Sequence, residues 1–187
     1  MPRKTHKWYI GAILHVTARG NHRSDIFKDE TDYKLYLNYL KEAIDYYENK
    51  HYIIAYVLMT NHVHLVIETT DCDISDLIKR VHSRYAWNFN NKYNCTGHLF
   101  QGRYKSELIQ DDTYMLEVSR YVHLNPVRAK MVKKPEDYRW GSYTMYTGER
   151  DEKLITSKRV LSYFKSGEEK ELYRKFVESG IRGQTPG

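Results

Sequence analysis

Apolar residues recur along the chain with two periods, and these periods predict strands and helices. Residues 9–17 and 51–59 are apolar at both parities, which is typical of strands that are buried on two faces. We read 51–59 as a central strand for that reason. Residues 62–68 follow it after Thr60 and Asn61, so the two segments predict a β-hairpin.

Helical spacing of apolar residues predicts helices over residues 32–48, 74–90 and about 113–125. Pro126 is expected to stop or kink the third of them. A further strand is predicted over 97–109. The order β-α-β-β-α-β-α indicates the α+β class, with a ferredoxin-like antiparallel sheet and an extra helix. We expect the helices to lie mainly on one face of the sheet.

The length of 187 residues fits one domain with an extension. We predict a domain over residues 1–148 and a charged, helical C-terminal extension over 149–187. Cys72 and Cys95 show no metal-ligand spacing, and no apolar run approaches the ~18 residues of a membrane span. The N-terminus lacks the apolar stretch of a secretory signal. We therefore expect a cytoplasmic protein without a membrane anchor.

The charge balance gives a weak indication of an acidic partner. Lys and Arg number 30 against 24 Asp and Glu, for a formal net charge of +6. Such a balance favours polyanions, although many soluble proteins carry as much charge. The 18 tyrosines are unusual, and aromatic rings among basic side chains suit stacking on unpaired bases. Many of them would equally serve as half-buried residues with the hydroxyl in water.

Two histidines interrupt the apolar run at residues 61–66, which read NHVHLV. Successive strand residues point to opposite faces, so His62 and His64 share the face opposite Val63 and Leu65. Two residues apart on a strand, they are separated by about 6.5–7 Å, and their rings can converge on one ion. A pair of exposed strand histidines is in general commoner than a metal site. The spacing alone leaves both interpretations open.

Two further polar residues share a face of the third predicted helix. Tyr121 and Asn125 are four residues apart, which places them one turn from each other. Apolar residues better suited to pack this helix on the sheet are Met115, Val118 and Val122. Pro126 acts mainly on the ψ angle of Asn125, so the side chain of Asn125 can keep a helical direction. The alternative is that Tyr121 is an amphipathic interface residue and Asn125 caps the helix end.

These residues carry a resemblance to a known family. NHVHLV resembles the His-hydrophobic-His motif of HUH endonucleases. RGNHR, GHLFQGRYKS and RYVHLNPVRA are similar, in this order and spacing, to segments of the REP-associated tyrosine transposases, which belong to the single-tyrosine insertion-sequence type. The likeness runs from about residue 8 to 148. It implies an HUH endonuclease fold, a divalent metal ion and cleavage of single-stranded DNA beside hairpins.

Residue by residue, the resemblance implies that His62, His64 and Asn125 bind the metal and that Tyr121 is the nucleophile. Two imidazoles and an amide oxygen suit Mg²⁺ or Mn²⁺, which would polarise the scissile phosphate. Attack by the tyrosine would leave a 5′-phosphotyrosine link and a free 3′-hydroxyl, and a 3′-hydroxyl can later rejoin strands. Free tyrosine has a pKa of about 10, so a base or a positive charge is required. Glu68 is a weak candidate for the base.

Basic and polar residues near these motifs are the candidate DNA contacts. We assign this role to Arg19, Asn21, Arg23, Arg103, Lys105, Arg120 and Arg128. Arg120 and Arg128 are also candidates for positive charge beside the tyrosine. Other basic residues that could follow the phosphates or simply be solvated are Lys79, Arg80, Arg84, Lys130, Lys133 and Lys134. Aromatic residues that could stack on bases or lie in the core are Phe100, Tyr104 and Trp140, of which we place Trp140 in the core. Three other histidines are expected to be structural: His15, His98 and His123.

Two competing functions remain open. A DNA-hairpin binding protein that does not cut DNA is the first, although binding alone needs none of the four predicted site residues. A metal phosphoesterase that uses water is the second, with Tyr121 merely structural. Replication initiators and relaxases share the tyrosine chemistry, but RYVHLNPVRA fits the transposase branch better. We expect single-stranded DNA with a hairpin as the partner, a nucleoid location, and either a monomer or a homodimer.

Overall fold

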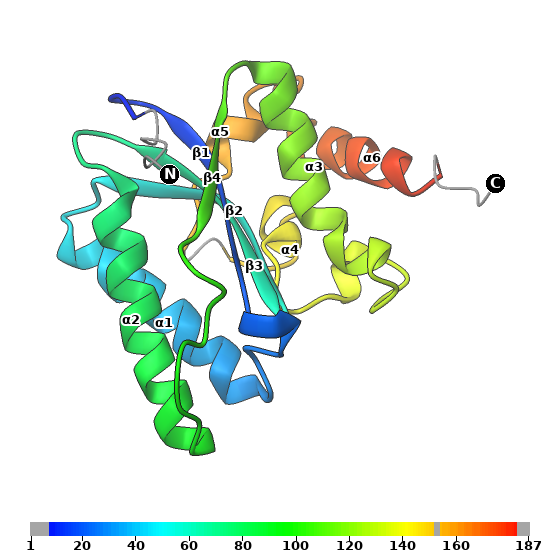
Figure 1. The fold of residues 1–187 in the computed structure, drawn as a ribbon. Coiled ribbons are helices and arrows are strands. Elements are labelled where there is room, and N and C mark those ends of the chain that lie inside the picture. The colour runs from blue at the N-terminus through cyan, green and yellow to red at the C-terminus, as the bar shows by residue number, and fades with distance from the viewer. Residues whose placement is uncertain (1–7, 152–153, 183–187) are drawn as a thin grey trace.

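The structure of the protein is a computed structural model, and residues 8–151 and 154–182 of it are described. Its centre is one antiparallel sheet in the order β2-β3-β1-β4 (Figure 1). The strands are β1 (Ile13–Arg19), β2 (His51–Met59), β3 (His62–Thr69) and β4 (Lys105–Ile109). Helix α1 (Glu30–Tyr46) connects β1 to β2, and α2 (Ile74–Tyr93) connects β3 to β4. This is the ferredoxin-like plan, so the predicted α+β class is confirmed.

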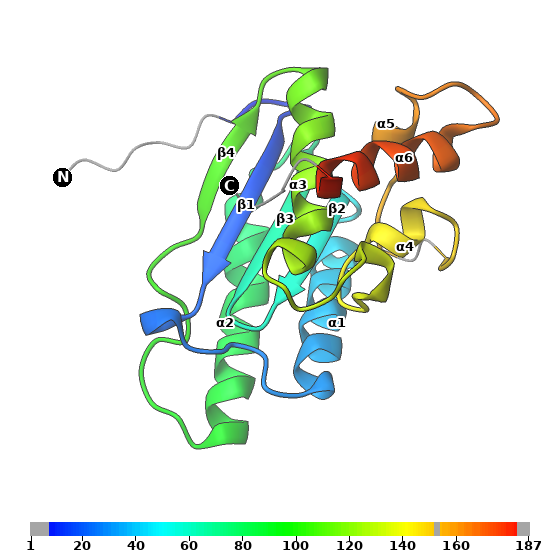
Figure 2. The ribbon, with the colours of Figure 1, turned by 90° about the vertical axis from the view of Figure 1, so that its right-hand side faces the viewer.

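The helices divide between the two faces of the sheet. Figure 2 shows α3 (Asp112–Arg128) in front of the sheet and the packed pair α1 and α2 behind it. Three shorter helices lie on the α3 side: α4 (Tyr143–Tyr146), α5 (Lys158–Leu161) and α6 (Glu169–Arg182). We expected the helices to lie mainly on one face of the sheet. Helices α1 and α2 do share a face, but the expectation was wrong for α3, which lies on the other face. The sheet has apolar residues on both faces, so each face requires a cover.

Strand β2 lies at an edge of the sheet, whereas its two-sided apolar pattern predicted a central strand. Both of its faces are covered, because α1 and α3 contact it. The chain after α3 also covers its outer edge. There the amide of Ser142 donates to the carbonyl of Tyr56 at 3.0 Å, and the amide of Leu58 donates to the carbonyl of Trp140 at 2.9 Å. Residues 53–59 are therefore all buried, which explains the apolar pattern of an edge strand.

Other boundaries differ in ways that have local causes. The strand predicted over 97–109 is regular only from Lys105, because Gly97 and Gly102 adopt φ angles of 90° and 69° and turn the chain. Helix α3 runs through Pro126 to Arg128. Asp111 caps the start of this helix by accepting from the amide of Tyr114 at 2.7 Å.

A buried polar network joins α3 to the C-terminal helix. The Nδ1 atom of His123 lies 2.7 Å from the hydroxyl of Tyr173 on α6, and its Nε2 atom lies 2.8 Å from Oγ of Ser142. The Tyr173 hydroxyl also donates to Ser119 at 3.2 Å. All four residues are buried. The network fixes α3 against α6 and the segment that covers β2, and the domain boundary at residue 148 stays a prediction.

Within the described ranges, no helix combines the length and the apolar character needed to cross a membrane.

Candidate functional site

The register of the sheet places polar residues side by side on the face that α3 covers. On β1 and β3, Thr17 pairs with His64 and Arg19 pairs with His62. Paired residues point to the same face, and residues two apart on a strand do so too. His15 therefore joins the same row, next to His64. The predicted metal pair is thus part of a larger polar cluster at the centre of the sheet.

Helix α3 brings the other two predicted site residues to this cluster. The ring of Tyr121 meets the ring of His64 edge to face, with 5.5 Å between their centres. Asn125, one turn further along, is 9% exposed, and its side chain is close enough to His62 to influence the pKa of that ring. The structure thus gathers His62, His64, Tyr121 and Asn125 from two elements that are far apart in the sequence. This meeting requires α3 on the histidine face.

Burial keeps both histidines neutral. His64 is 5% exposed, and burial, with smaller effects of His15 and His62, lowers its pKa to about 3. Burial and then the charge of Arg19 lower the pKa of His62. A neutral imidazole has a lone pair for a metal, whereas a protonated one does not. The pair is therefore in the protonation state that a metal ligand needs at neutral pH.

Asn61 fixes the orientation of His62. Its Oδ1 atom lies 2.6 Å from Nδ1 of His62, and its Nδ2 atom donates to the carbonyl of Arg23 at 3.1 Å. The second contact sets which end of the amide faces His62, because a carbonyl oxygen only accepts. His62 must then donate from Nδ1, which leaves the lone pair on Nε2 free to bind a ligand.

The donor set fits a small divalent cation of the Mg²⁺ or Mn²⁺ type. Across residues 8–151 and 154–182, no group of three or more His, Cys, Asp or Glu side chains could hold a metal ion. The cluster offers two neutral imidazoles and one amide oxygen, a set that needs further oxygen ligands from water or a substrate phosphate. The residues fit an open site that is completed by its substrate.

The surroundings of Tyr121 include one of the two arginines that we expected there. Tyr121 is 38% exposed, and the Arg128 guanidinium lies 5.1 Å from the centre of its ring. Arg120 instead pairs with Glu117 and lies over Phe176 of α6. Arg120 therefore faces the C-terminal helix rather than the site.

The candidate base Glu68 lies too far along β3. It is four residues from His64, about 13 Å at the rise of a strand. Its charge acts instead on Tyr163, whose pKa is raised mainly by burial. Glu68 is therefore not placed to take a proton from Tyr121.

The RGNHR loop is held directly beside His62. The amide of Gly20 donates to the carbonyl of Asn61 at 2.8 Å, and the amide of Asn21 donates to that of Leu99 at 2.8 Å. A Cβ atom at Gly20 would come within 2.1 Å of the Ser24 carbonyl oxygen, so only glycine fits there. His22 and Arg23 then adopt positive φ angles of 50° and 61°. The loop is a strained and closely fixed structure, as loops at functional sites often are.

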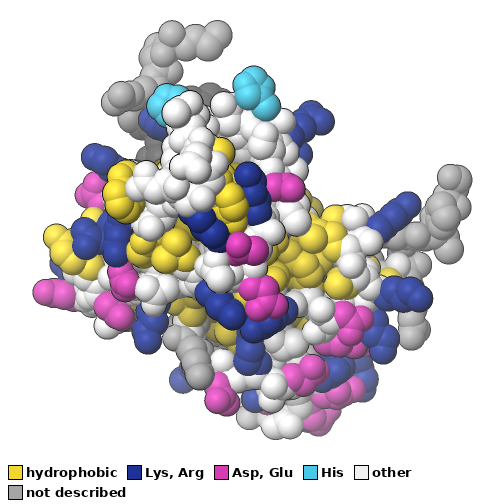
Figure 3. Space-filling model, turned by 90° about the horizontal axis from the view of Figure 1, so that it is seen from below, with side chains coloured by type: hydrophobic (Ala, Val, Ile, Leu, Met, Phe, Trp, Pro, Cys, Tyr) yellow, Lys and Arg dark blue, Asp and Glu magenta, His cyan; other side chains and the backbone are white. Residues whose placement is uncertain are grey.

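The other basic residues that could contact DNA divide between the two sides of the sheet. Lys105 pairs with Thr17 and so shares the histidine face, and the exposed Arg103 precedes it. On α2, Arg80 lies over the Tyr46 ring and Arg84 pairs with Glu42 on the opposite side of the sheet. Figure 3 views the lower surface, where Lys and Arg are interspersed with Asp and Glu around hydrophobic surface. That surface does not single out a DNA site.

Most of the remaining candidates have structural contacts. Trp140 stacks on Tyr33 at 4.5 Å between ring centres, as expected of a core residue. Phe100 stacks on His82 at 4.3 Å. The Tyr104 hydroxyl lies 3.0 Å from Oγ of Ser75. Of the histidines expected to be structural, His123 is buried in the α3 network and His98 is exposed.

His15 is the functional candidate that sequence reasoning missed. Its Nε2 atom lies 2.9 Å from Nδ1 of His64, and its ring centre lies 6.0 Å from that of Tyr121. A histidine within an apolar run was the available signal. Its partner is 49 residues away in the sequence, so only the strand register could reveal the contact.

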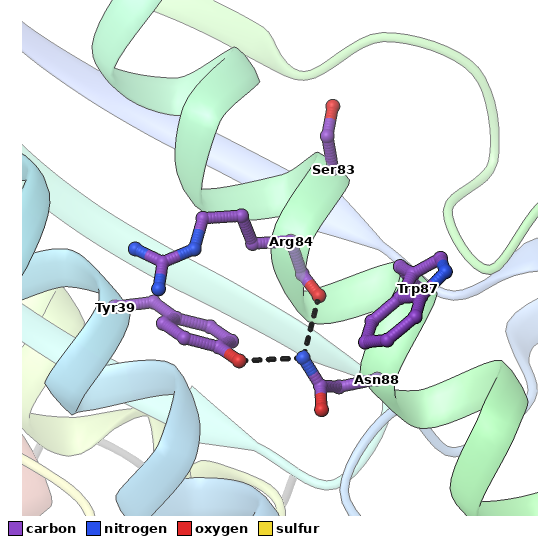
Figure 4. Close-up of a pocket in the computed structure, with 5 residues that line it drawn as sticks. All are labelled: Tyr39, Ser83, Arg84, Trp87 and Asn88. Carbon is purple, nitrogen blue, oxygen red and sulfur yellow. Dashed lines mark hydrogen bonds between the residues drawn. The ribbon is translucent and has the colours of Figure 1, made fainter.

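An open pocket lies away from this cluster, on the outer side of α1 and α2. It has a volume of about 400 Å³ and is lined by Tyr39, Ser83, Arg84, Trp87 and Asn88 (Figure 4). Nδ2 of Asn88 donates to the hydroxyl of Tyr39 and to the carbonyl of Arg84. The contact with Tyr39 joins the two helices, and no residue of the histidine face lines the pocket.

Comparisons with known proteins identify the family and agree with the fold. The sequence model of the family described as IS200-like transposase matches residues 9–125. The structure of a REP-associated tyrosine transposase bound to a REP hairpin superposes with a TM-score of 0.66 at 17% identity, over 86% of this chain and 93% of that one. At this identity the superposition shows a common fold. Comparison with curated protein sequences found no match.

Two other solved structures are less similar to this protein, with lower TM-scores. A candidate transposase from Deinococcus radiodurans R1 aligns at 18% identity with a TM-score of 0.44, over 65% of this chain and 95% of that one. The tRNA(His) guanylyltransferase of Saccharomyces cerevisiae aligns at 11% identity with a TM-score of 0.48, over 98% and 85%. Neither TM-score is high enough to support a family assignment. That assignment rests on the sequence model of the family, which matches more than half of the 187 residues. The chain belongs to the IS200-like transposases, a family of DNA-processing proteins.

Proposed function

We propose that the protein cleaves and rejoins single-stranded DNA beside hairpins, with Tyr121 as the nucleophile and a divalent metal at His62, His64 and Asn125. The observation that carries the proposal is the edge-to-face contact between Tyr121 and His64 at 5.5 Å. A reactive hydroxyl beside a pair of neutral imidazoles is what metal-assisted attack on a phosphate requires.

The proposed reaction is a transesterification that starts from this geometry. The Tyr121 oxygen, having lost its proton, attacks phosphorus, and the bond to the sugar 3′-oxygen breaks. The 3′-oxygen of the upstream fragment leaves and takes up a proton, while the downstream fragment stays on the protein through a 5′-phosphotyrosine link. When bound, Mg²⁺ or Mn²⁺ supplies a Lewis acid that polarises the scissile phosphate. Arg128 lies beside the Tyr121 ring, and its positive charge stabilises the negative charge that develops in the transition state.

The surroundings of the site support a single strand as the substrate. Arg19, Arg23, Lys105 and Arg128 are exposed, and their elements lie around the histidine cluster. Such charges bind phosphates without reading sequence. Tyr121 is only partly exposed and sits against buried rings, so a flexible single strand reaches it more readily than a duplex. Hairpin recognition is proposed by analogy with the REP-associated transposase whose solved structure contains a REP hairpin. A nucleoid location in the cytoplasm follows from that role.

A denaturing gel separates this proposal from its two competitors. Single strands copied from hairpin repeats beside the gene would be labelled at the 3′ end, because the downstream fragment remains on the protein. With Mn²⁺ present, we expect a labelled species that migrates with the protein after boiling in detergent. Cut DNA with no such species would indicate hydrolysis by water, and binding without cutting would indicate a hairpin-binding protein. Either result would contradict the proposal.

A further inference from the structure

We infer that His15 is a positioning residue that holds His64 in the tautomer and orientation needed for metal binding. This inference rests on the proposed function and adds a residue to it. His15 comes from β1, outside every motif that indicates the site. It is half-buried in the same row of side chains as Thr17 and His64.

The contact between the two rings is close and directional. Nε2 of His15 lies 2.9 Å from Nδ1 of His64, and the two rings are nearly parallel, with 20° between their planes. The hydroxyl of Thr17 lies farther from the same Nδ1 atom, at 3.4 Å. At 2.9 Å one nitrogen must donate and the other accept, because two lone pairs at that distance would repel. His15 therefore decides which nitrogen of His64 carries the hydrogen.

Either His15 or His64 could donate the hydrogen in this contact, and the geometry of the site selects His64 as the donor. His64 can offer a lone pair only from Nε2, because Nδ1 is engaged with His15. Nδ1 must then carry the hydrogen and donate it, and His15 must accept through Nε2. The hydrogen of His15 consequently sits on its own Nδ1 atom. Partners of this kind fix the tautomer and the ring orientation of histidines that bind metals.

Each of the two predicted ligand histidines has a hydrogen-bond partner at its Nδ1 atom, and the partner differs between them. Asn61 accepts from Nδ1 of His62 at 2.6 Å, and His15 stands in the corresponding place at His64. His15 has one additional contact, because its ring meets that of Tyr121 edge to face with 6.0 Å between centres. It therefore packs against both the predicted ligand and the predicted nucleophile. An amide at position 15 would supply the acceptor but not the ring contact.

The most direct test reads the tautomer of His64 in the metal-free protein. In uniformly ¹⁵N-labelled protein, long-range ¹H–¹⁵N correlation spectra distinguish Nδ1–H from Nε2–H imidazoles. We expect His64 to be Nδ1–H in the wild type and in His15→Gln, whose Oε1 atom can accept in place of Nε2. His15→Leu removes the acceptor, so we expect a shift towards Nε2–H. A wild-type His64 that is Nε2–H, or a tautomer unchanged in His15→Leu, would overturn the inference.

Metal affinity gives a second reading that does not depend on cleavage. Loss of such a partner typically weakens metal binding by about 10- to 100-fold. We expect that loss of Mn²⁺ affinity in His15→Leu and affinity within a few-fold of wild type in His15→Gln. His98→Leu is the matched control, because His98 is exposed and lies outside the cluster. Wild-type affinity in His15→Leu would contradict the inference.

The two proposals fail in distinguishable ways. If His62→Ala and the wild type bind Mn²⁺ equally, the proposed metal site is wrong, yet the spectrum of the metal-free protein still decides the role of His15. If the wild type binds Mn²⁺ through His62 while His15→Leu behaves like wild type, only the role of His15 is wrong. The wild-type spectrum requires no variant, so a misfolded His15→Leu protein does not prevent the test.

Discussion

The guanidinium of Arg128 lies over the ring of Tyr121, 5.1 Å from its centre, although the two residues are seven positions apart on α3. Seven residues make two helical turns, so both side chains are on the same face of α3. Arg120 is next to Tyr121 in the sequence but lies over Phe176 of α6. Of the two arginines, Arg128 is therefore the one placed to act on the tyrosine.

Replacement of Arg128 should slow cleavage without unfolding the protein. A positive charge near the ring stabilises the negative charge that develops in the transition state, so Arg128→Gln should reduce the rate of covalent adduct formation by about 10-fold or more. Arg120→Gln is the control, since that side chain contacts α6 and should alter stability rather than rate. Equal rates for Arg128→Gln and wild type in single-turnover assays would exclude this role.

Removal of either predicted ligand histidine should abolish metal-dependent cleavage. A bound metal contributes several kcal/mol to the transition state, so His62→Ala and His64→Ala should each lose about 100-fold or more in rate. Hairpin binding should change little, because the basic residues around the site remain. His98→Ala, at an exposed histidine, should retain both activities. Cleavage by either site variant at the wild-type rate would show that the metal is bound elsewhere or not used.

Acidic pH should destabilise the fold through two histidines that lie outside the site. Burial lowers the pKa of His82 and of His123 to about 3, whereas both titrate near 6.5 in the unfolded chain. Below pH 6.5 the unfolded chain binds protons that the folded protein does not, so the free energy of unfolding falls as pH falls. The slope approaches about 1.4 kcal/mol per pH unit for each histidine.

Urea unfolding between pH 7 and pH 5 measures this effect above the range in which most carboxylates titrate. The double variant His82→Gln and His123→Gln should show a flatter dependence on pH than the wild type. Parallel curves for the two proteins would mean that these histidines do not cause the loss.

The buried network between α3 and α6 predicts a specific loss of stability. Tyr173→Phe removes the hydroxyl that lies 2.7 Å from Nδ1 of His123 and leaves this buried nitrogen without that partner. Such a loss costs about 1–3 kcal/mol. Tyr163→Phe, whose hydroxyl donates to Asp112 at the surface, should cost about 0.5 kcal/mol or less. Equal unfolding midpoints for Tyr173→Phe and wild type in urea would contradict the role given to the network.

Local patterns predicted much of the fold and the residues of the candidate site. The period of two in a strand placed His62 and His64 on one face, and the helical period placed Tyr121 near Asn125. Both relations hold because they depend only on geometry within one element. The position of α3 was not predictable in the same way. β2 is apolar on both faces, so either face could accept the helix.

Contacts between distant elements explain what the sequence could not show. The pairing of His15 with His64 depends on the register of β1 and β3, which no local pattern encodes. The pairing of Arg120 with Phe176 depends on where α6 docks. The strand expected over residues 97–109 failed for a local reason, because glycines at both 97 and 102 adopt positive φ.

The central claim is that Tyr121 becomes covalently linked to DNA, and the same helix supplies a matched control. Tyr114 lies two turns before Tyr121 on α3 and is equally exposed, at 38%. With a 3′-labelled hairpin substrate and Mn²⁺, the wild type and Tyr114→Phe should form the adduct, and Tyr121→Phe should not. Mass spectrometry should then find the nucleotide on the tryptic peptide 121–128, whose one tyrosine is Tyr121. An adduct formed by Tyr121→Phe, or a nucleotide on another peptide, would contradict the account.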